Sequence, residues 1–321
     1  MDFDFSPEQL AVRDLARELF EKESPPSRLR ELWSGAERDR SVWKALGQAG
    51  LLEITDPVDL VLVLEEAGRA ALPEPIAETL AIAAPVLAEA GSDWVPRVAS
   101  GEAIVAVQLG GAPFVVDAGD ADLLLLERDG ELHALPHDAF TATPVQSDDK
   151  ARRLYAVNAH TGSETRIAGD AGVALDRGAA AVAAVLNGIS MRMLEMTLEH
   201  VKTREQFGKP VGSFQAVKHK LASAHVRVES ARAAAWYAAF AIGAGLPDRS
   251  LAASVAKVVA AEAEAIANAE ALQCHGGIGF TWEHDLHMWM KRGKALEASF
   301  GTAAEHRARV AAHVLSEQAD A

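Results

Sequence analysis

Cysteine is almost absent, since Cys274 is the only one in a chain of 321 residues. A single thiol excludes an internal disulfide and favours a reducing, cytoplasmic location. No run of about 18 uninterrupted apolar residues occurs, so no membrane span is expected. The first residues, Met1 to Phe5, contain no basic segment followed by an apolar run. No secretory signal peptide is therefore expected.

Positive charge is also scarce, with 31 Lys and Arg against 46 Asp and Glu and a formal net charge of −15. An acidic chain repels phosphate backbones and anionic lipid surfaces, so neither nucleic acid nor a membrane is an expected partner. No short repeat or low-complexity linker interrupts the sequence. The length and a hydrophobic content of 49% predict a substantial core divided into two or three domains.

The first third, residues 1–102, is predicted to be a helical domain. Ser6, Pro7 and Gln9 form a helix start, because Ser6 can cap, Pro7 suits the first helical position and Gln9 can complete a capping box. Apolar residues then recur at helical spacing. Further helices are expected over residues 38–49, 60–71 and 75–90.

The pattern changes over residues 103–171, where short apolar runs are separated by Gly, Asp and Pro. Such runs predict four or five strands of a small, reduced β-domain. Asp129-Gly130 is a favoured hairpin turn. The expected strands lie near residues 104–107, 114–116, 123–126, 132–135 and 154–157.

Helical periodicity returns in residues 172–321 and predicts a C-terminal four-helix bundle. The expected helices cover residues 179–204, 214–243, 250–274 and 295–315. The fold class is therefore mainly α with a small β-domain between two helical parts.

Two motifs stand out in the bundle. One runs from Arg204 to Pro210 as Arg-Glu-Gln-Phe-Gly-Lys-Pro, with Gln215 shortly after it, and the other runs from Gln273 to Phe280 as Gln-Cys-His-Gly-Gly-Ile-Gly-Phe. The planar, charged fork of Arg204 suits a pair of phosphate oxygens. Glycines such as those of the second motif let backbone amides approach a diphosphate closely.

With this domain order, the two motifs resemble those of the acyl-CoA dehydrogenase family. The resemblance implies an FAD that accepts a hydride from the β-carbon of an acyl-CoA thioester, while a glutamate removes the α-proton. It also implies that six positions contact the FAD of a neighbouring subunit: Arg204, Phe207, Gln215, Gln273, Gly276 and Gly277. The simpler alternatives are that Arg204 pairs with a carboxylate, that the glycines only end a helix, and that Phe207 packs in the core.

The sequence departs from the family at the catalytic base. Where the family has its usual glutamate before Gly-Thr, this chain has Phe300, and at the alternative base position it has Gly178. Neither side chain can accept a proton, so no catalytic residue is assigned. Glu297 and Asp176 are the possible substitutes. The stretch from Val105 to Pro113 also lacks the hydroxyl and acidic residues that contact the flavin ring in the family.

These features predict the short, base-lacking subunit of an FAD-dependent, heterotetrameric (α2β2) acyl-CoA dehydrogenase. A longer catalytic partner would bind the substrate, and by family analogy that substrate is a bulky, steroid-derived acyl-CoA of actinobacterial steroid degradation. Two alternatives remain open: a flavin-free scaffold or regulatory homologue, and an autonomous flavoenzyme that uses Glu297 or Asp176 as base. No metal site is expected, because the spacing of His275, His284, Asp285 and His287 does not match a helical pair of histidines.

Overall fold

The N-terminal part is helical in the computed structural model, which describes residues 4–319. Ser6 caps the first helix and Gln9 completes the capping box, as the sequence predicts. Two short helices, α2 and α6, were not predicted, because α2 follows a Pro-Pro pair and each has fewer than three turns of apolar pattern. The helices are α1 (Pro7–Glu23), α2 (Pro26–Trp33), α3 (Ser41–Gln48), α4 (Pro57–Arg69), η2 (Ala77–Ala83), α5 (Ala84–Glu89) and α6 (Trp94–Ala99).

The β region forms two small sheets with strand orders β1-β3-β4-β7 and β2-β6-β5. The Asp129-Gly130 hairpin is confirmed: both residues have positive φ, 54° and 80°, between antiparallel β3 and β4. The count of four or five strands is wrong, because β5 and β7 were missed. β5 contains Pro144 and lies at a sheet edge, where a proline is tolerated. The strands are β1 (Val105–Gln108), β2 (Val115–Val116), β3 (Leu123–Arg128), β4 (Glu131–Pro136), β5 (Phe140–Val145), β6 (Leu154–Ala159) and β7 (Arg166–Ile167).

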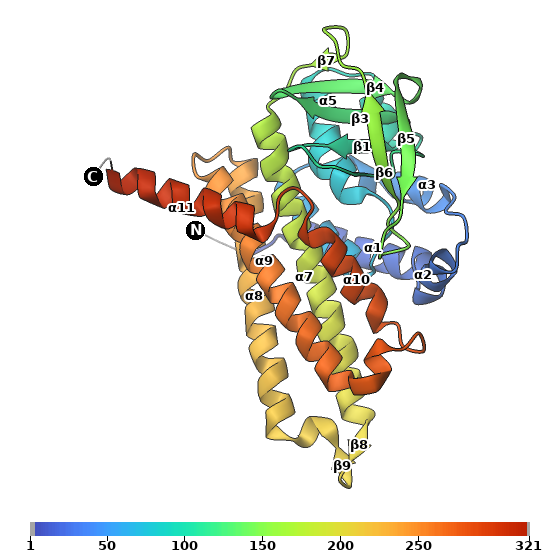
Figure 1. Ribbon diagram of the computed structural model, residues 1–321, viewed down its shortest axis with the longest axis vertical. Coiled ribbons are helices and arrows are strands. Elements are labelled where there is room, and N and C mark those ends of the chain that lie inside the picture. The colour runs from blue at the N-terminus through green and yellow to red at the C-terminus, as the bar shows by residue number, and fades with distance from the viewer. Residues whose placement is uncertain (1–3, 320–321) are drawn as a thin grey trace.

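The C-terminal part is built on three long helices with two shorter ones beside them (Figure 1). The prediction of one helix over residues 295–315 is wrong, because the chain breaks at Phe300 (φ 54°) and Gly301 (φ 98°). That break separates α10 from α11 and contains the expected base position. The helices are α7 (Ala171–Thr203), α8 (Gln215–Gly243), α9 (Arg249–His275), α10 (Leu286–Glu297) and α11 (Ala303–Ala319).

The bundle is elongated, with the sheets at one end and a small hairpin, β8 (Glu205–Gln206) and β9 (Lys209–Pro210), at the other (Figure 1). α7 is long and apolar enough to cross a membrane by length and composition alone. However, 78% of its most apolar window is buried inside the protein, as in the central helix of a bundle. The predicted fold class is confirmed, whereas the domain bounds at residues 102/103 and 171/172 stay predictions.

Two glycines bring α4 and α7 into backbone contact. A Cβ on Gly188 would lie 1.9 Å from the carbonyl oxygen of Glu65, and one on Gly68 would lie 2.1 Å from that of Val185. Neither helix tolerates a side chain at the crossing. This contact fixes the N-terminal helices against the bundle.

Candidate functional site

The two expected base positions meet in space, although α7 and the α10–α11 break are far apart in sequence. A Cβ on Gly178 would lie 2.7 Å from Cγ and 2.8 Å from Cδ1 of Phe300. The phenyl ring therefore lies directly against the bare Cα of Gly178. An apolar contact therefore occupies both positions at which the resemblance leads one to expect a proton-accepting carboxylate.

The interior next to this contact is filled by paired charges. Arg152 donates to the hydroxyl of Ser299 (2.8 Å) and to the carbonyl of Ala295 (3.2 Å), and it lies 3.8 Å from Glu78. Burial raises the pKa of Glu78 and lowers that of Arg152. The cavity that both residues line is small, about 40 Å³.

Two buried side chains, those of Lys257 and His306, hold the break between α10 and α11 in place. The Nζ of Lys257 donates to the carbonyl oxygens of Glu297 (2.8 Å) and Gly301 (2.7 Å). The Nε2–H of His306 donates to the carbonyl of Phe300 at 2.9 Å. Burial lowers the pKa of Lys257 to about 8. These contacts hold the Phe300 backbone in its left-handed conformation.

The two substitute bases lie in different settings. The Glu297 carboxylate is half-buried and pairs with Lys294 at 3.2 Å. Asp176 is buried, accepts a hydrogen bond from Ser250 and lines a cavity of about 330 Å³ together with Arg309. Burial raises the pKa of Asp176. Asp176 thus combines a raised pKa with an adjoining cavity.

The six positions expected to contact FAD gather at the hairpin end of the bundle (Figure 1). They come from the end of α7, the β8–β9 hairpin, the start of α8 and the end of α9, and all six are exposed. We call them the dinucleotide-contact set: Arg204, Phe207, Gln215, Gln273, Gly276 and Gly277.

The polar side chains of this set lack hydrogen-bond and ion-pair partners among the described residues, and the ring of Phe207 meets that of Phe214 edge-on at 6.2 Å. Within residues 4–319, no hydrogen bond or ion pair involves the side chains of Arg204, Gln215 or Gln273. The alternative pairing of Arg204 with a carboxylate is thus not found there. Phe207 is 93% exposed, so core packing does not explain it. The set presents an unpaired guanidinium, two amides and a ring to whatever lies against this end.

The two glycines of the set differ in what the chain itself requires. Gly276 has a φ of 64°, which ends α9 and favours glycine. A Cβ added at Gly277 would have no neighbour within 4 Å, and the φ of this residue is not positive. The chain's own packing therefore does not demand glycine at 277.

The tertiary structure adds a residue that the sequence did not single out. His200, one turn before Arg204, stacks on His275 with ring centroids 4.4 Å apart. The ring of His284 lies 4.6 Å from that of His275. No group of three or more metal-binding side chains suited to an ion occurs in the part of the chain that the structure describes.

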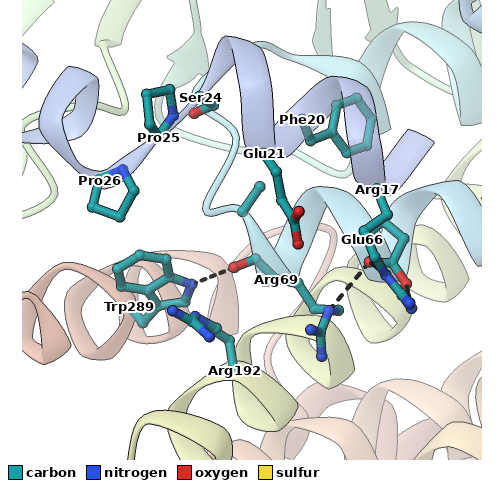
Figure 2. A pocket seen from close by; sticks show the side chains of 11 residues that line it. Arg17, Phe20, Glu21, Ser24, Pro25, Pro26, Glu66, Arg69, Arg192 and Trp289 are labelled. Carbon is teal, nitrogen blue, oxygen red and sulfur yellow. Dashed lines mark hydrogen bonds and ion pairs between the residues drawn. The ribbon is translucent and has the colours of Figure 1, made fainter. Parts of the chain in front are cut away.

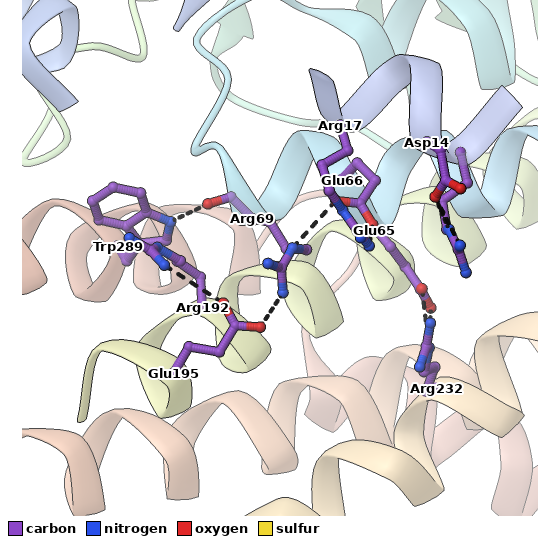
Figure 3. Close-up of polar contacts among 10 residues, drawn as sticks. Asp14, Arg17, Glu65, Glu66, Arg69, Arg192, Glu195, Arg232 and Trp289 are labelled. Carbon is purple, nitrogen blue, oxygen red and sulfur yellow. Dashed lines mark hydrogen bonds and ion pairs between the residues drawn. The ribbon is translucent and has the colours of Figure 1, made fainter. Parts of the chain in front are cut away.

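A surface cleft of about 200 Å³ lies between α1, α4, α7 and α10 (Figure 2). Its charged side chains form a ladder of ion pairs: Arg17 and Arg69 pair with Glu66, Arg69 also pairs with Glu195, and Arg192 lies 3.5 Å from Glu195 (Figure 3). The ladder joins α1 and α4 to α7 and so fixes the N-terminal helices against the bundle.

Comparisons with known proteins agree with this architecture. The model of the acyl-CoA dehydrogenase N-terminal domain matches residues 6–102, and that of the acyl-CoA dehydrogenase C-terminal domain matches residues 170–315. The chain belongs to the acyl-CoA dehydrogenase family.

Among individual relatives, acyl-CoA dehydrogenase IpdE2 of Mycobacterium tuberculosis is 35% identical over 300 residues, which are 89% of this chain and 90% of the relative. IpdE2 of Mycolicibacterium smegmatis is 33% identical over 321 residues, which cover 96% and 99%. A solved variant of the steroid ACAD Tcur3481–Tcur3483 superposes with a TM-score of 0.86 and 26% identity, and the match covers 98% of this chain and 99% of that one.

Proposed function

We propose that this chain is the base-lacking subunit of a heteromeric, FAD-dependent acyl-CoA dehydrogenase. The observation that carries the proposal is the contact between Phe300 and Gly178, which closes both family base positions with apolar groups. The hairpin end, by contrast, keeps an exposed and unpaired dinucleotide-contact set. The chain would therefore complete the FAD site of a catalytic partner rather than one of its own.

The residues have distinct roles in this proposal. When bound, FAD supplies the hydride acceptor for α,β-dehydrogenation of an acyl-CoA thioester. Arg204 would hold phosphate oxygens through its fork, and the amides near Gly276 and Gly277 would donate to the same diphosphate. The amides of Gln215 and Gln273 can donate and accept around it. The proton-accepting carboxylate and the acyl-CoA pocket would come from the partner, in an α2β2 assembly.

The comparisons support the partner and the substrate class by analogy. Tcur3481–Tcur3483 is named for two components and described as a steroid ACAD. By that analogy, we propose a longer catalytic homologue as partner and a bulky, steroid-derived acyl-CoA as substrate.

The test is co-expression of the full chain with candidate homologues that carry a glutamate at a base position. The complex is expected to retain flavin absorbance and to dehydrogenate acyl-CoA, whereas the chain alone is not. Arg204→Ala should weaken FAD binding by about ten- to a hundredfold through loss of charge-assisted hydrogen bonds. Arg128→Ala is the matched control, because Arg128 is exposed on the β3–β4 hairpin at the opposite end.

Each contrary result has a definite meaning. Stoichiometric FAD and turnover in the chain alone would refute the proposal and favour an autonomous flavoenzyme. Asp176 is then the better base, because it is buried beside a cavity of about 330 Å³, and Asp176→Asn should abolish that turnover. A stable complex without flavin, unaffected by Arg204→Ala, would instead indicate a scaffold.

A further inference from the structure

Three imidazoles from three elements meet at the end of α9. His200 lies in the last turn of α7, His275 is the final residue of α9, and His284 lies in the loop before α10. The rings of His200 and His275 stack at an interplanar angle of 20°, and that of His284 meets His275 edge-on at 65°. We call these residues the histidine trio.

The hydrogen bonds constrain the protonation of two of them. The Nδ1 of His275 donates to the carbonyl of Ala271 at 2.8 Å, which the neutral and the protonated ring can both do. Its Nε2 is buried and has no hydrogen-bond partner, so a proton there would be left without an acceptor. The Nδ1 of His284 accepts the backbone N–H of Leu286 at 3.1 Å, so this ring is neutral and carries its proton on Nε2. The arrangement therefore favours the neutral form of both rings.

His275 also supports the glycine turn directly. A Cβ on Gly279 would lie 3.0 Å from the Cβ of His275, so the turn folds back onto this residue. Gly276 and Gly277 lie between these two contacts in the chain. The segment that carries their amides therefore starts at His275 and packs back against it.

Few charged groups face the trio. Arg204 approaches from α7, and Arg30 and Asp285 form an ion pair at 2.6 Å beside His284. Burial is the main cause that lowers the pKa of all three histidines, and it lowers that of His275 to about 4. The mutual proximity of the rings and the charges of Arg204 and Arg30 act in the same direction, whereas Asp285 opposes it at His284.

We propose that His275, in ring contact with both His200 and His284, is a positioning residue that holds the Gln273–Gly277 turn in its phosphate-binding shape only while the trio is neutral. This inference rests on the proposed function, because the ligand of the turn is the partner's FAD. A proton on Nε2 of His275 would have no acceptor. A proton on Nδ1 of His284 would displace the N–H of Leu286 from the start of α10.

The sign of the effect follows from the lowered pKa. The folded turn favours neutral His275. The contribution of His275 to the stability of the turn is therefore fully present above the ordinary pKa of about 6.5, and it is lost as the pH falls toward the folded pKa of about 4. From this residue alone, the equilibrium constant for opening of the turn should rise about tenfold between about pH 7.5 and about pH 5.5.

The first measurement uses the full chain without cofactor. A histidine-resolved NMR titration should show His275 resisting protonation well below the ordinary range, and hydrogen exchange should show that protection of the Gly276–Phe280 amides falls about tenfold over the same interval. His275→Asn keeps a donor near the position of Nδ1 but cannot be protonated, so its exchange profile should be flat. His219→Asn is the control, because His219 is an exposed imidazole of α8.

The second measurement uses the FAD-loaded complex and follows FAD affinity against pH. Wild type should lose about tenfold more affinity than His275→Asn between about pH 7.5 and about pH 5.5. Identical profiles, or ordinary titration of His275 in the chain alone, would overturn the inference and leave the proposed function intact. No FAD at any pH, with the exchange result as expected, would overturn the proposed function and leave the positioning of the turn. If His275→Asn does not fold, the NMR titration of His275 in the wild-type chain still tests the inference.

Discussion

The phenyl ring of Phe300 rests on the bare Cα of Gly178, with 2.7 Å between its Cγ and a Cβ built at that glycine. Each residue explains the other: the ring fits because position 178 has no side chain, and the glycine is needed because the ring is there. Because the two residues fill both base positions of the family, neither position carries a side chain that can accept a proton.

A methyl group at position 178 should disturb this contact. Gly178→Ala would also meet Ile82 at 2.9 Å, so we expect a loss of about 1–3 kcal/mol in the free energy of unfolding, measured by urea titration. Phe300→Leu in the same background should recover part of the loss. Gly243→Ala is the control, because its Cβ would make only ordinary contacts of 3.6 Å or more. Equal effects of both alanines would contradict the packing described.

Lys257 should make the stability of the chain rise with pH in the alkaline range. Its folded pKa, about 8, lies below the ordinary 10.5, so the folded state favours the neutral amine. The free energy of unfolding should therefore rise between about pH 8 and about pH 10.5, by about 3 kcal/mol at most. Urea titrations of Lys257→Met should show no such rise, whereas Lys218→Met, at an exposed position on α8, should keep it.

Glu65 has the opposite dependence. It is buried and accepts hydrogen bonds from Arg232 (Figure 3) and from Trp236. Burial raises its pKa to about 7. The folded state therefore favours the protonated acid. Stability should fall as the pH rises from about 4.5 through about 7, and Glu65→Gln should lack this fall. Thermal unfolding across this range checks it, with Glu18→Gln, exposed on α1, as the control. Parallel curves for wild type and Glu65→Gln would speak against the raised pKa.

Alanine substitutions at Gly277 and at Gly279 should distinguish an effect on cofactor contact from an effect on folding. Gly277→Ala places a methyl group in open space, so the chain should fold with a stability within about 0.5 kcal/mol of wild type, while the complex loses FAD affinity. Gly279→Ala meets His275 and Leu272 at 3.0 and 3.1 Å and should destabilise the chain itself. Calorimetry of the chain and flavin absorbance of the complex provide the two readouts. Unchanged FAD affinity in Gly277→Ala would argue against contact at this turn.

Local sequence patterns predicted the long elements well. Ser6, Gln9 and the Asp129-Gly130 turn act through neighbours in the chain, so their signals are complete in a few residues. The break at Phe300 was missed, because the apolar period continues across it and its cause lies in Lys257 and His306 from elsewhere in the bundle. The cytoplasmic location expected from the single Cys274 stays a prediction.

The sequence by itself determined the family resemblance and the absence of a proton acceptor at residues 178 and 300, because residue identity alone decides whether a side chain can accept a proton. The dinucleotide-contact set stays a prediction from the sequence. Only the tertiary structure decided that Gly178 and Phe300 touch, and that His200 joins His275 and His284. Such pairings depend on how α7, α9 and the α10–α11 break pack against one another. No local period encodes them, since each partner comes from a distant part of the chain.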